Sequence, residues 1–447
     1  MRKLIFGTAM CLMTGFTFAQ SNNSTVEQVG NDNSSSVDQS GSNLATVNQG
    51  SDLTTQAYSN NNATTILQIG TSNVATANTI GDRNTIDQIQ DGSGNTATAK
   101  QGSARDLIPG LGIFQVTKSN DNAIDQFQEG NGNTATADQG GLGAGMNMID
   151  QDQIGDENTA TANQNAGASN NMITQLQTGD ENTAFAQQGS GGGISTFGNA
   201  IDQNQLGNNN MAEARQLITS TNSTADQDQE GDFNNATSVQ QGDNNLVTQT
   251  QTGNDNTASA RQDGTFAGTS FDNSITQTQI GDTNNTLADQ TGDQNNSEQD
   301  QNGTFHKSEV FQNGTRNTSR TNQSATNNSA YVNQIGIRNV SNINQNTVGN
   351  NEAIVNQDGD VNRSSILQKG DDNFADTDQS GRANRSNLDQ IGAHNISMTM
   401  QMGEGNISLL MQEGNENMST VNQNGMMNMS TVNQLGNMNT STVNQSN

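Results

Sequence analysis

The sequence has little of what a conventional hydrophobic core requires. Its 447 residues include no tryptophan, one proline and 3% aromatic side chains, and hydrophobic residues make up only 28% of the chain. A chain so poor in large apolar side chains is unable to build a core of the usual kind. Low hydrophobicity together with a formal net charge of -29 is also typical of disordered chains. Composition alone therefore points to disorder, unless a regular pattern supplies an unconventional core.

Cysteine is nearly absent as well, because the single one, Cys11, lies in an apolar run near the N-terminus. This run extends from Leu4 to Phe18, follows two basic residues, and leads to a small residue, Ala19. These features are typical of a secretory signal, and the run is too short for a membrane anchor. We therefore expect residues 1–19 to be removed and the protein to be secreted. The mature chain would have no disulfide or thiol chemistry, and no later stretch is apolar enough to enter a membrane.

What the sequence does contain is a repeat of eleven residues, which is strictest between residues 357 and 445. Glutamine occurs once per repeat, glycine follows it by two residues, and asparagine follows it by five. A disordered chain has no reason to keep such offsets, so the repeat argues against disorder. The repeated residues are Gln357, Gln368, Gln379, Gln390, Gln401, Gln412, Gln423, Gln434 and Gln445, with Gly359, Gly370, Gly381, Gly392, Gly403, Gly414, Gly425 and Gly436, and with Asn362, Asn373, Asn384, Asn395, Asn406, Asn417, Asn428 and Asn439.

Each unit reads Asn-x-Ser/Ala-x-aliphatic-x-Gln, followed by x-Gly-x-x. The first part alternates with a period of two, which is typical of a strand, and glycine in a short polar connection indicates a turn. A unit this short cannot bury a face alone, so successive units must stack. The sequence predicts an all-β fold: a β-solenoid of stacked two-strand coils (strand, turn, strand), with 22–28 residues per coil and parallel in-register ladders.

The regularity of the repeat divides the chain into four predicted segments. Residues 1–19 are the signal peptide, 20–61 are irregular repeats, 62–290 are repeats with variable loops, and 291–447 are strict eleven-residue half-repeats. In the third segment, strands with two glutamines alternate with strands with two alanines, so bulky side chains would face small ones. Almost all extra residues follow the alanine strands, which predicts that the loops leave from one edge. These insertions are Gly102 to Asp121, Gly140 to Met146, Gly189 to Gly198, and Asp263 to Asp272.

The repeated positions within a strand share one parity, so they point to one face and the variable positions to the other. The variable positions are rich in Asp, Thr, Asn and Arg, so the repeated face should be the interior. An unpaired buried amide costs about 1–3 kcal/mol. In coils stacked about 4.8 Å apart, however, each Asn or Gln amide can donate to the copy above and accept from the copy below. We therefore predict a core of amide ladders, with glycine at the turns.

The pattern Gln-x-Gly-x-x-Asn-x-Ala/Ser resembles the signature of curlin subunits, and the similarity covers most of residues 62–447. The resemblance implies a secreted β-solenoid subunit of curli-type amyloid fibres, outside a Gram-negative bacterium. It also implies outer-membrane secretion machinery as a partner, with a nucleator or another curlin-like subunit as a further one. The sequence departs from familiar curlins in its length and loops, in His306 at an asparagine position, and in Ala325 and Thr347 at glycine positions.

No catalytic constellation, cofactor, metal site or nucleic-acid site is expected from the sequence. His306 occupies a ladder position and His394 a turn, which favours structural or solvated roles for both. Three acidic turns suit either a divalent cation or solubilising charge, and the second is favoured because the acidic ligand set of a calcium β-roll is absent. These turns are Gly155-Asp156-Glu157, Gly179-Asp180-Glu181 and Gly281-Asp282.

Methionine is concentrated near the C-terminus, and by parity its side chains point outward. Lys and Arg are absent after Arg385, so these methionines form an apolar strip. Such a strip is either a lateral interface or incidental β-forming filler. Its members are Met398, Met400, Met411, Met418 and Met429.

Taken together, these features predict a structural protein and not an enzyme. We expect a secreted subunit of extracellular curli-like amyloid fibres that acts in biofilm matrix, cell adhesion and aggregation, and whose main partner is itself, end to end. The alternative is a non-polymerising cell-surface β-solenoid adhesin whose one-sided loops bind a ligand.

Overall fold

The computed structural model describes residues 21–50, 59–107, 114–117, 120–140, 145–165, 168–189, 196–217, 220–263, 270–347 and 349–447. These residues form strands and short turns, and none of them is helical. Within the same ranges, no helix capable of crossing a membrane is found. The predicted signal peptide and Cys11 lie outside the described residues. The chain divides into two compact units, Met1–Ala225 and Asp226–Asn447.

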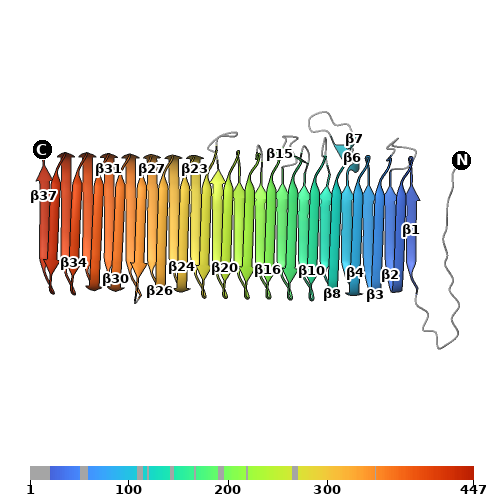
Figure 1. Ribbon diagram of the computed structural model, residues 1–447, viewed down its shortest axis with the longest axis horizontal. Helices are drawn as coiled ribbons and strands as arrows, with labels where there is room; N and C mark the ends of the chain where they lie inside the picture. The colour runs from blue at the N-terminus through green and yellow to red at the C-terminus, as the bar shows by residue number, and fades with distance from the viewer. Residues whose placement is uncertain are drawn as a thin grey trace. The chain divides into compact units, whose positions relative to one another are not determined.

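In the first unit, two stacks of parallel strands face each other (Figure 1). Strands β2 (Ser34–Gln49) and β3 (Ala63–Thr79) are long, and each runs from one stack through a turn into the other. One stack continues with β4 (Thr85–Ser93), β8 (Ala123–Asn131), β10 (Met148–Ile154), β13 (Met172–Thr178) and β16 (Ala200–Leu206). The other contains β1 (Asn23–Gln28), β5 (Thr96–Gln101), β9 (Thr134–Gln139), β11 (Thr159–Gln164), β14 (Thr183–Gln188) and β17 (Met211–Gln216).

In the second unit, even-numbered and odd-numbered strands form the two stacks, which we call the even stack and the odd stack; β18 (Thr224–Glu230) begins at the end of the first unit. The even stack contains β20 (Leu246–Thr252), β22 (Ser274–Ile280), β24 (Asn296–Thr304), β26 (Thr318–Thr326), β28 (Val340–Asn346), β30 (Arg363–Asp371), β32 (Arg385–Ala393), β34 (Ile407–Glu413) and β36 (Met429–Leu435). The odd stack contains β19 (Asn235–Gln240), β21 (Thr257–Asp263), β23 (Asn285–Asp293), β25 (Lys307–Thr315), β27 (Ser329–Ile337), β29 (Glu352–Asp360), β31 (Phe374–Arg382), β33 (Ile396–Glu404), β35 (Met418–Met426) and β37 (Thr440–Ser446).

The predicted fold class, an all-β solenoid with parallel in-register ladders, is confirmed within each unit. Equivalent residues of successive coils pair directly, for example Gln357 with Gln379 and Gly359 with Gly381. Most coils advance by 22 to 28 residues. The predicted range is too narrow elsewhere, because the step is 38 residues between Gln88 and Gln126 and 29 or 30 between β2 and β3. Insertions at a turn lengthen the coil and leave the ladder unchanged.

The interior of each unit is built from the repeated residues, as the strand parity requires. In the first unit, alanines and isoleucines of the two stacks form one buried cluster, with Ile149, Ala162 and Ile173 fully buried. In the second unit the corresponding cluster contains larger aliphatic residues such as Val355 and Leu388. Between these apolar rows lie buried amides and hydroxyls, so buried polar residues outnumber buried hydrophobic ones in the described ranges.

Parts of the insertions carry structure of their own. In the first unit, β6 (Ser103–Leu107) and β7 (Phe114–Thr117) form an antiparallel pair within the Gly102 to Asp121 insertion. Strand β12 (Ala168–Ser169) pairs with β15 (Thr196–Phe197), which lies in the Gly189 to Gly198 insertion. Strands β6, β7 and β15 lie beyond the same ends of the long strands (Figure 1). The middle of every insertion lies outside the described residues.

Candidate functional site: the amide ladders and their turns

The glutamines form continuous ladders with one direction. Nε2 of Gln357 donates to Oε1 of Gln379 at 2.8 Å, and Nε2 of Gln379 donates to Oε1 of Gln401 at 2.7 Å. Nε2 of Gln357 also donates to the main-chain carbonyl of Val340 in the even stack, at 3.0 Å. Each glutamine therefore joins two coils and cross-links the two stacks. The predicted glutamines Gln357, Gln368, Gln379, Gln390, Gln401, Gln412, Gln423 and Gln434 are buried, and Gln445 is half-buried.

The asparagines bond mainly to the main chain, which differs from the expected amide-to-amide ladder. Oδ1 of Asn362 accepts the backbone N–H of Asn384 at 3.0 Å, and Nδ2 of Asn362 donates to the carbonyl of Gly381 at 3.0 Å. An amide-to-amide contact is added in part of the column, as from Asn384 to Asn362 at 3.2 Å. The asparagine side chain is one methylene shorter than glutamine, so its amide lies beside the turn backbone. Asn362, Asn373, Asn384, Asn395, Asn406 and Asn417 are buried, whereas Asn428 and Asn439 are half-buried.

The glycine of each turn is required by backbone conformation and by space. Gly359 has a φ of 113°, a value that residues other than glycine rarely adopt. A Cβ atom built on Gly359 would lie 2.1 Å from the carbonyl oxygen of Gly381 in the next coil. Positive φ holds for all eight predicted turn glycines: Gly359, Gly370, Gly381, Gly392, Gly403, Gly414, Gly425 and Gly436.

A second turn position was missed by sequence reasoning. The residue just before each ladder asparagine also has positive φ, even when it is β-branched, as in Val361 at 59°. Its hydrogen bonding explains this, because the N–H of Val361 donates to the carbonyl of Ile337 in the preceding coil at 2.8 Å. The left-handed conformation is thus imposed by the neighbouring coil. The signal in the sequence is the frequent Asn, Asp or Gly at this position, as in Asn327, Asp372 and Gly405, because these residues tolerate positive φ best.

The two departures at the glycine position have a common cause. Ala325 has φ of 84° and Thr347 has φ of 77°, so both keep the left-handed side of the conformational map. They belong to successive turns of the even stack, and the second turn contains the extra residue of this region. The pairing of β26 with β28 accordingly stops at Gln323 and Gln345, before the turn. The turn after Ala325 therefore does not continue the register of the preceding coils.

His306 replaces an asparagine by reproducing its bonds. Its own N–H donates to Oδ1 of Asn284 at 3.1 Å, and its Nδ1 accepts the N–H of Asn328 at 3.2 Å, as an asparagine Oδ1 would. Nε2 faces the carbonyls of Asn302 and Ala325, where an asparagine Nδ2 would lie, but without good hydrogen-bond geometry. Burial lowers the pKa of His306 below its ordinary value. The ring is therefore neutral at pH 7 and structural.

The acidic turns form a further ladder within each unit. Oδ1 of Asp156 accepts the backbone N–H of Asn131 at 2.8 Å, and Oδ1 of Asp180 accepts that of Asp156 at 2.9 Å. Asp282 does the same for Asn254 at 2.8 Å. These carboxylates replace bonds that the turn backbone lacks. In the described ranges, no group of three or more His, Cys, Asp or Glu side chains is arranged to hold a metal ion.

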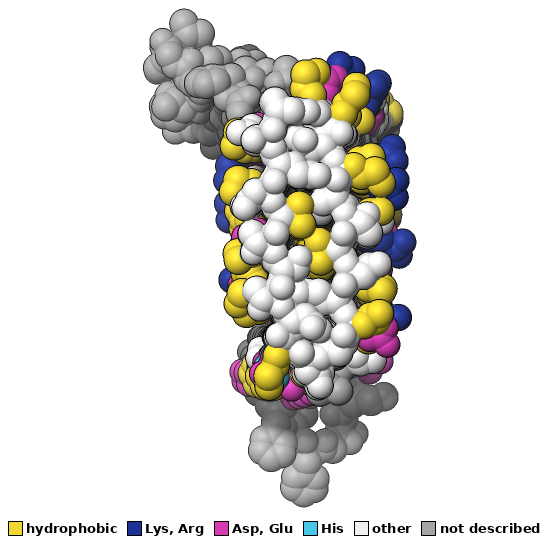
Figure 2. Space-filling view, turned by 90° about the vertical axis from the view of Figure 1, so that its left-hand side faces the viewer, with side chains coloured by type: hydrophobic (Ala, Val, Ile, Leu, Met, Phe, Trp, Pro, Cys, Tyr) yellow, Lys and Arg dark blue, Asp and Glu magenta, His cyan; other side chains and the backbone are white. Residues whose placement is uncertain are grey.

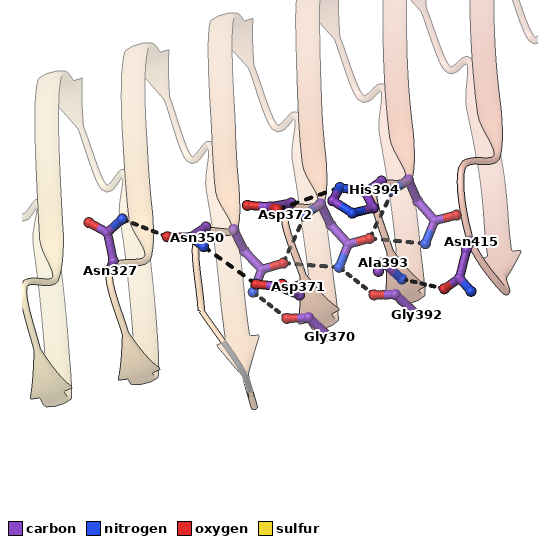
Figure 3. Close-up of polar contacts among 12 residues, drawn as sticks. Asn327, Asn350, Gly370, Asp371, Asp372, Gly392, Ala393, His394 and Asn415 are labelled. Atoms are coloured by element: carbon purple, nitrogen blue, oxygen red, sulfur yellow. Dashed lines mark hydrogen bonds and ion pairs between the residues drawn. The ribbon is translucent and has the colours of Figure 1, made fainter.

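A similar edge in the second unit is shown in Figure 3. Asn415 Oδ1 accepts the N–H of Ala393 at 2.9 Å, and His394 Nδ1 lies 3.5 Å from Asp372 Oδ2 (Figure 3). Both His394 and Asp372 are exposed. His394 is thus one of the left-handed turn residues, with φ of 56°, and its side chain lies at the surface.

This turn ladder gives a first testable prediction. Asp156→Ala should destabilise the first unit by about 1 kcal/mol, because the N–H of Asn131 loses its acceptor at the surface. Asp156→Asn keeps an Oδ1 acceptor and should have little effect, which chemical denaturation would measure. Equal losses in the two variants would instead indicate that the charge, and not the hydrogen bond, stabilises the turn.

Carboxylates also occur in register on the outer faces of the strands. Asp125 pairs with Asp87 on one side and with Asp150 on the other, and burial, followed by the neighbouring carboxylates, raises the pKa of Asp125. In the second unit, burial and then the charges of Asp378 and Glu352 raise the pKa of Asp376 to about 6. Like charges directly opposite each other on a sheet are destabilising.

The raised pKa of Asp376 predicts a pH dependence with a definite sign. Between its unfolded value near 3.8 and about 6, the folded state binds more protons, so stability falls as pH rises through 6. Asp376→Asn should therefore stabilise the second unit at pH 7.5, by about 1 kcal/mol after allowance for solvent screening, and have little effect at pH 4. The control Asp358→Asn removes one charge from the same face. A gain for Asp376→Asn that is independent of pH would contradict this assignment.

The comparisons with known proteins agree with this geometry. Residues 349–381 match the family model of the curlin associated repeat. This segment contains β29, β30, most of β31 and the first ladder residues of the strict repeat. No curated protein matches the chain closely enough to count as a relative. The repeat family and the solenoid fold are structural rather than catalytic. The predicted resemblance is confirmed for residues 349–381, the segment that matches the curlin associated repeat.

Proposed function

We propose that this chain is a secreted structural subunit of extracellular curli-like amyloid fibres, and that subunits join end to end. It would act in biofilm matrix, cell adhesion and aggregation. The observation that carries the proposal is the in-register pairing of identical ladder residues, such as Gln357 with Gln379. Each ladder residue pairs with an identical residue of the next coil. A coil of a second copy carries the same residues and can therefore form the same pairs.

The direction of the glutamine ladders makes the two sides of a coil complementary. Each coil offers Oε1 on one side and Nε2 on the other, as Gln379 does between Gln357 and Gln401. Strand β37 pairs with β35, and its other edge has no partner among the described strands. Such an edge is a template for a matching strand. A coil of another copy would continue both the sheet and the glutamine ladder at the same spacing.

The test is assembly of the purified mature chain. We expect unbranched fibrils by electron microscopy, with a meridional fibre-diffraction reflection near 4.8 Å. The net charge of -29 opposes association, so growth should quicken with added salt. A chain that stays monomeric at high concentration and high salt for days would refute the proposal.

A matched pair of variants in β37 tests the end-to-end contact itself. Val443 points inward against the aliphatic cluster, whereas Thr442 points outward and is exposed. Val443→Asp should slow fibril elongation strongly, because it puts a charge at the joining surface, while Thr442→Asp should elongate normally. Circular dichroism of both monomers would show that the remaining coils still fold. Normal elongation of Val443→Asp would show that β37 does not join copies.

The alternative is a non-polymerising adhesin, and the β6–β7 pair favours it, because an insertion with its own strands offers a formed surface. Shortening residues 102–121 to a four-residue turn removes no ladder residue. Loss of surface attachment by a variant whose coils remain folded would favour the adhesin, whereas unchanged attachment would leave the fibre subunit as the better account.

A further inference from the structure

The outer face of the even stack carries two arginines that lack an ion-pair partner. Arg363 and Arg385 pair directly with each other in β30 and β32, so two positive charges lie one coil apart. Neither forms an ion pair with any residue that the structure describes. With Asn342 and Asn387 they line a shallow groove of about 390 Å³. In-register like charges are unfavourable unless an anion binds between them.

The outer face of the odd stack shows the opposite charge at the same level of the solenoid. Glu352 of β29 and Asp376 and Asp378 of β31 are outward, and Oδ1 of Asp376 is buried without a hydrogen-bond partner. On the odd strands β27, β29, β31, β33 and β35, no Lys or Arg occupies an outward sheet position, and Arg382 of β31 lies past the turn glycine. This face therefore carries an excess of carboxylates, whereas at the outward sheet positions of β30 and β32 the even face carries Arg363, Lys369 and Arg385 against one carboxylate, Asp389.

The next coil continues the match with apolar residues. On the odd face β33 presents Met398, Met400 and Met402, all between 40% and 47% exposed. On the even face, the outward positions of β34 in the same coil are Ile407, Leu409 and Met411. Figure 2 shows this end of the second unit, with hydrophobic side chains along both outer faces.

We propose that a second copy of this chain docks laterally, the odd face of one copy on the even face of the next, without axial offset. In this register Asp358 of β29 and Asp378 of β31 lie toward the strand ends that carry Arg363 and Arg385, Glu352 lies toward Lys369, and the methionines of β33 meet β34. Each level of one face finds its complement at the same level of the other. The inference rests on the proposed function, because lateral contacts repeated along a fibre bundle it with its neighbours.

The size of the surface suits such a contact. Five coils of strands about seven residues long present roughly 23 Å by 24 Å, or about 550 Å² on each copy. Two copies would bury about 1,100 Å², which is near the lower limit of a specific interface and becomes additive along a fibre. A second copy is a better occupant than a soluble anionic polymer, because it supplies partners for both the arginines and the carboxylates. A polymer would also have to approach a chain of charge -29.

Charge reversal on either face tests the proposal. One variant carries Arg363→Glu and Arg385→Glu, and the other carries Asp376→Lys and Asp378→Lys. In each variant on its own, the two outer faces carry charge of the same sign, so we expect single filaments. Bundling, measured by electron microscopy and pelleting, should be at least about tenfold lower than in the wild type. Fibrils of the two variants mixed should bundle again, because each supplies the charge that the other lacks. High salt should dissolve wild-type bundles while leaving the filaments intact.

The control reverses two arginines in turns, Arg316→Glu with Arg338→Glu, and should bundle as the wild type does. Unchanged bundling of either face variant, or no recovery on mixing, would overturn the proposal. If the arginine variant keeps its bundles but loses binding of a polyuronate, the arginines bind an anionic polymer and lateral docking is wrong. If no fibrils form at all, the proposed function fails, and sedimentation of the monomers still decides: the wild type should associate at low salt and the arginine variant should not.

Discussion

Replacing Val421 by Asp is expected to unfold the coils around β35, at a cost of about 4 kcal/mol or more. Val421 is fully buried between Thr399 of β33 and Val443 of β37, within the aliphatic cluster of the second unit. A carboxylate there has no cation within reach and no water, so it must either remain charged at great cost or be neutralised. Chemical denaturation would show an early transition for these coils.

The control for this prediction is the adjacent residue. Thr420 is outward and half-buried, and its neighbours in register are Met398 and Thr442. Thr420→Asp should change stability by less than about 0.5 kcal/mol. Similar losses at positions 420 and 421 would mean that the strand parity is wrong.

Gly381→Ala should destabilise the second unit by about 3 kcal/mol, although it adds a single methyl group. Gly381 has φ of 108°, and the added Cβ would lie 2.2 Å from the carbonyl oxygen of Gly403. The turn would have to move away, and the carbonyl of Gly381 would then lose the bond that it accepts from Asn362. The loss should therefore exceed that of an ordinary glycine substitution.

Ser380→Ala, one residue away, is the matching control, because Ser380 is outward and exposed. Its expected effect on the denaturation midpoint is close to zero. The natural Ala325 does not contradict the prediction, since the turn that follows it contains an extra residue. A Gly381→Ala variant as stable as the wild type would show that the coils separate more easily than the structure implies.

The sequence was sufficient to predict the strands of the two stacks, their parity and their register, but not the short strands β6, β7 and β15 within the insertions. Residues such as Val355 and Gln357 recur at fixed offsets. Because the side chains of a strand alternate between two faces, one register alone places each repeated position beside the same position of the next coil. The glycine turns followed for the same reason. At these positions local sequence preferences and tertiary contacts favour the same structure, so the strands could be predicted from the sequence alone.

The remaining features depend on contacts between coils that no local pattern shows. The left-handed conformation of Val361 is imposed by the carbonyl of Ile337, and many residue types occupy that position. The acceptor role of Asp156 requires the turn of the preceding coil to lie beside it. Arg363 and Asp376 occupy variable positions on opposite faces, so the repeat does not constrain their charges.

The single direction of the glutamine ladders has an electrical consequence. From Gln240 to Gln445, every side-chain amide of the odd column points its N–H toward the next coil, so their dipoles add instead of cancelling. Main-chain dipoles of a sheet largely alternate, but these side chains behave like the aligned peptides of an α-helix, and each bond polarises the next. The second unit therefore carries a permanent axial polarity, positive where Nε2 emerges and negative where Oε1 does, which favours addition of copies in one orientation over its reverse.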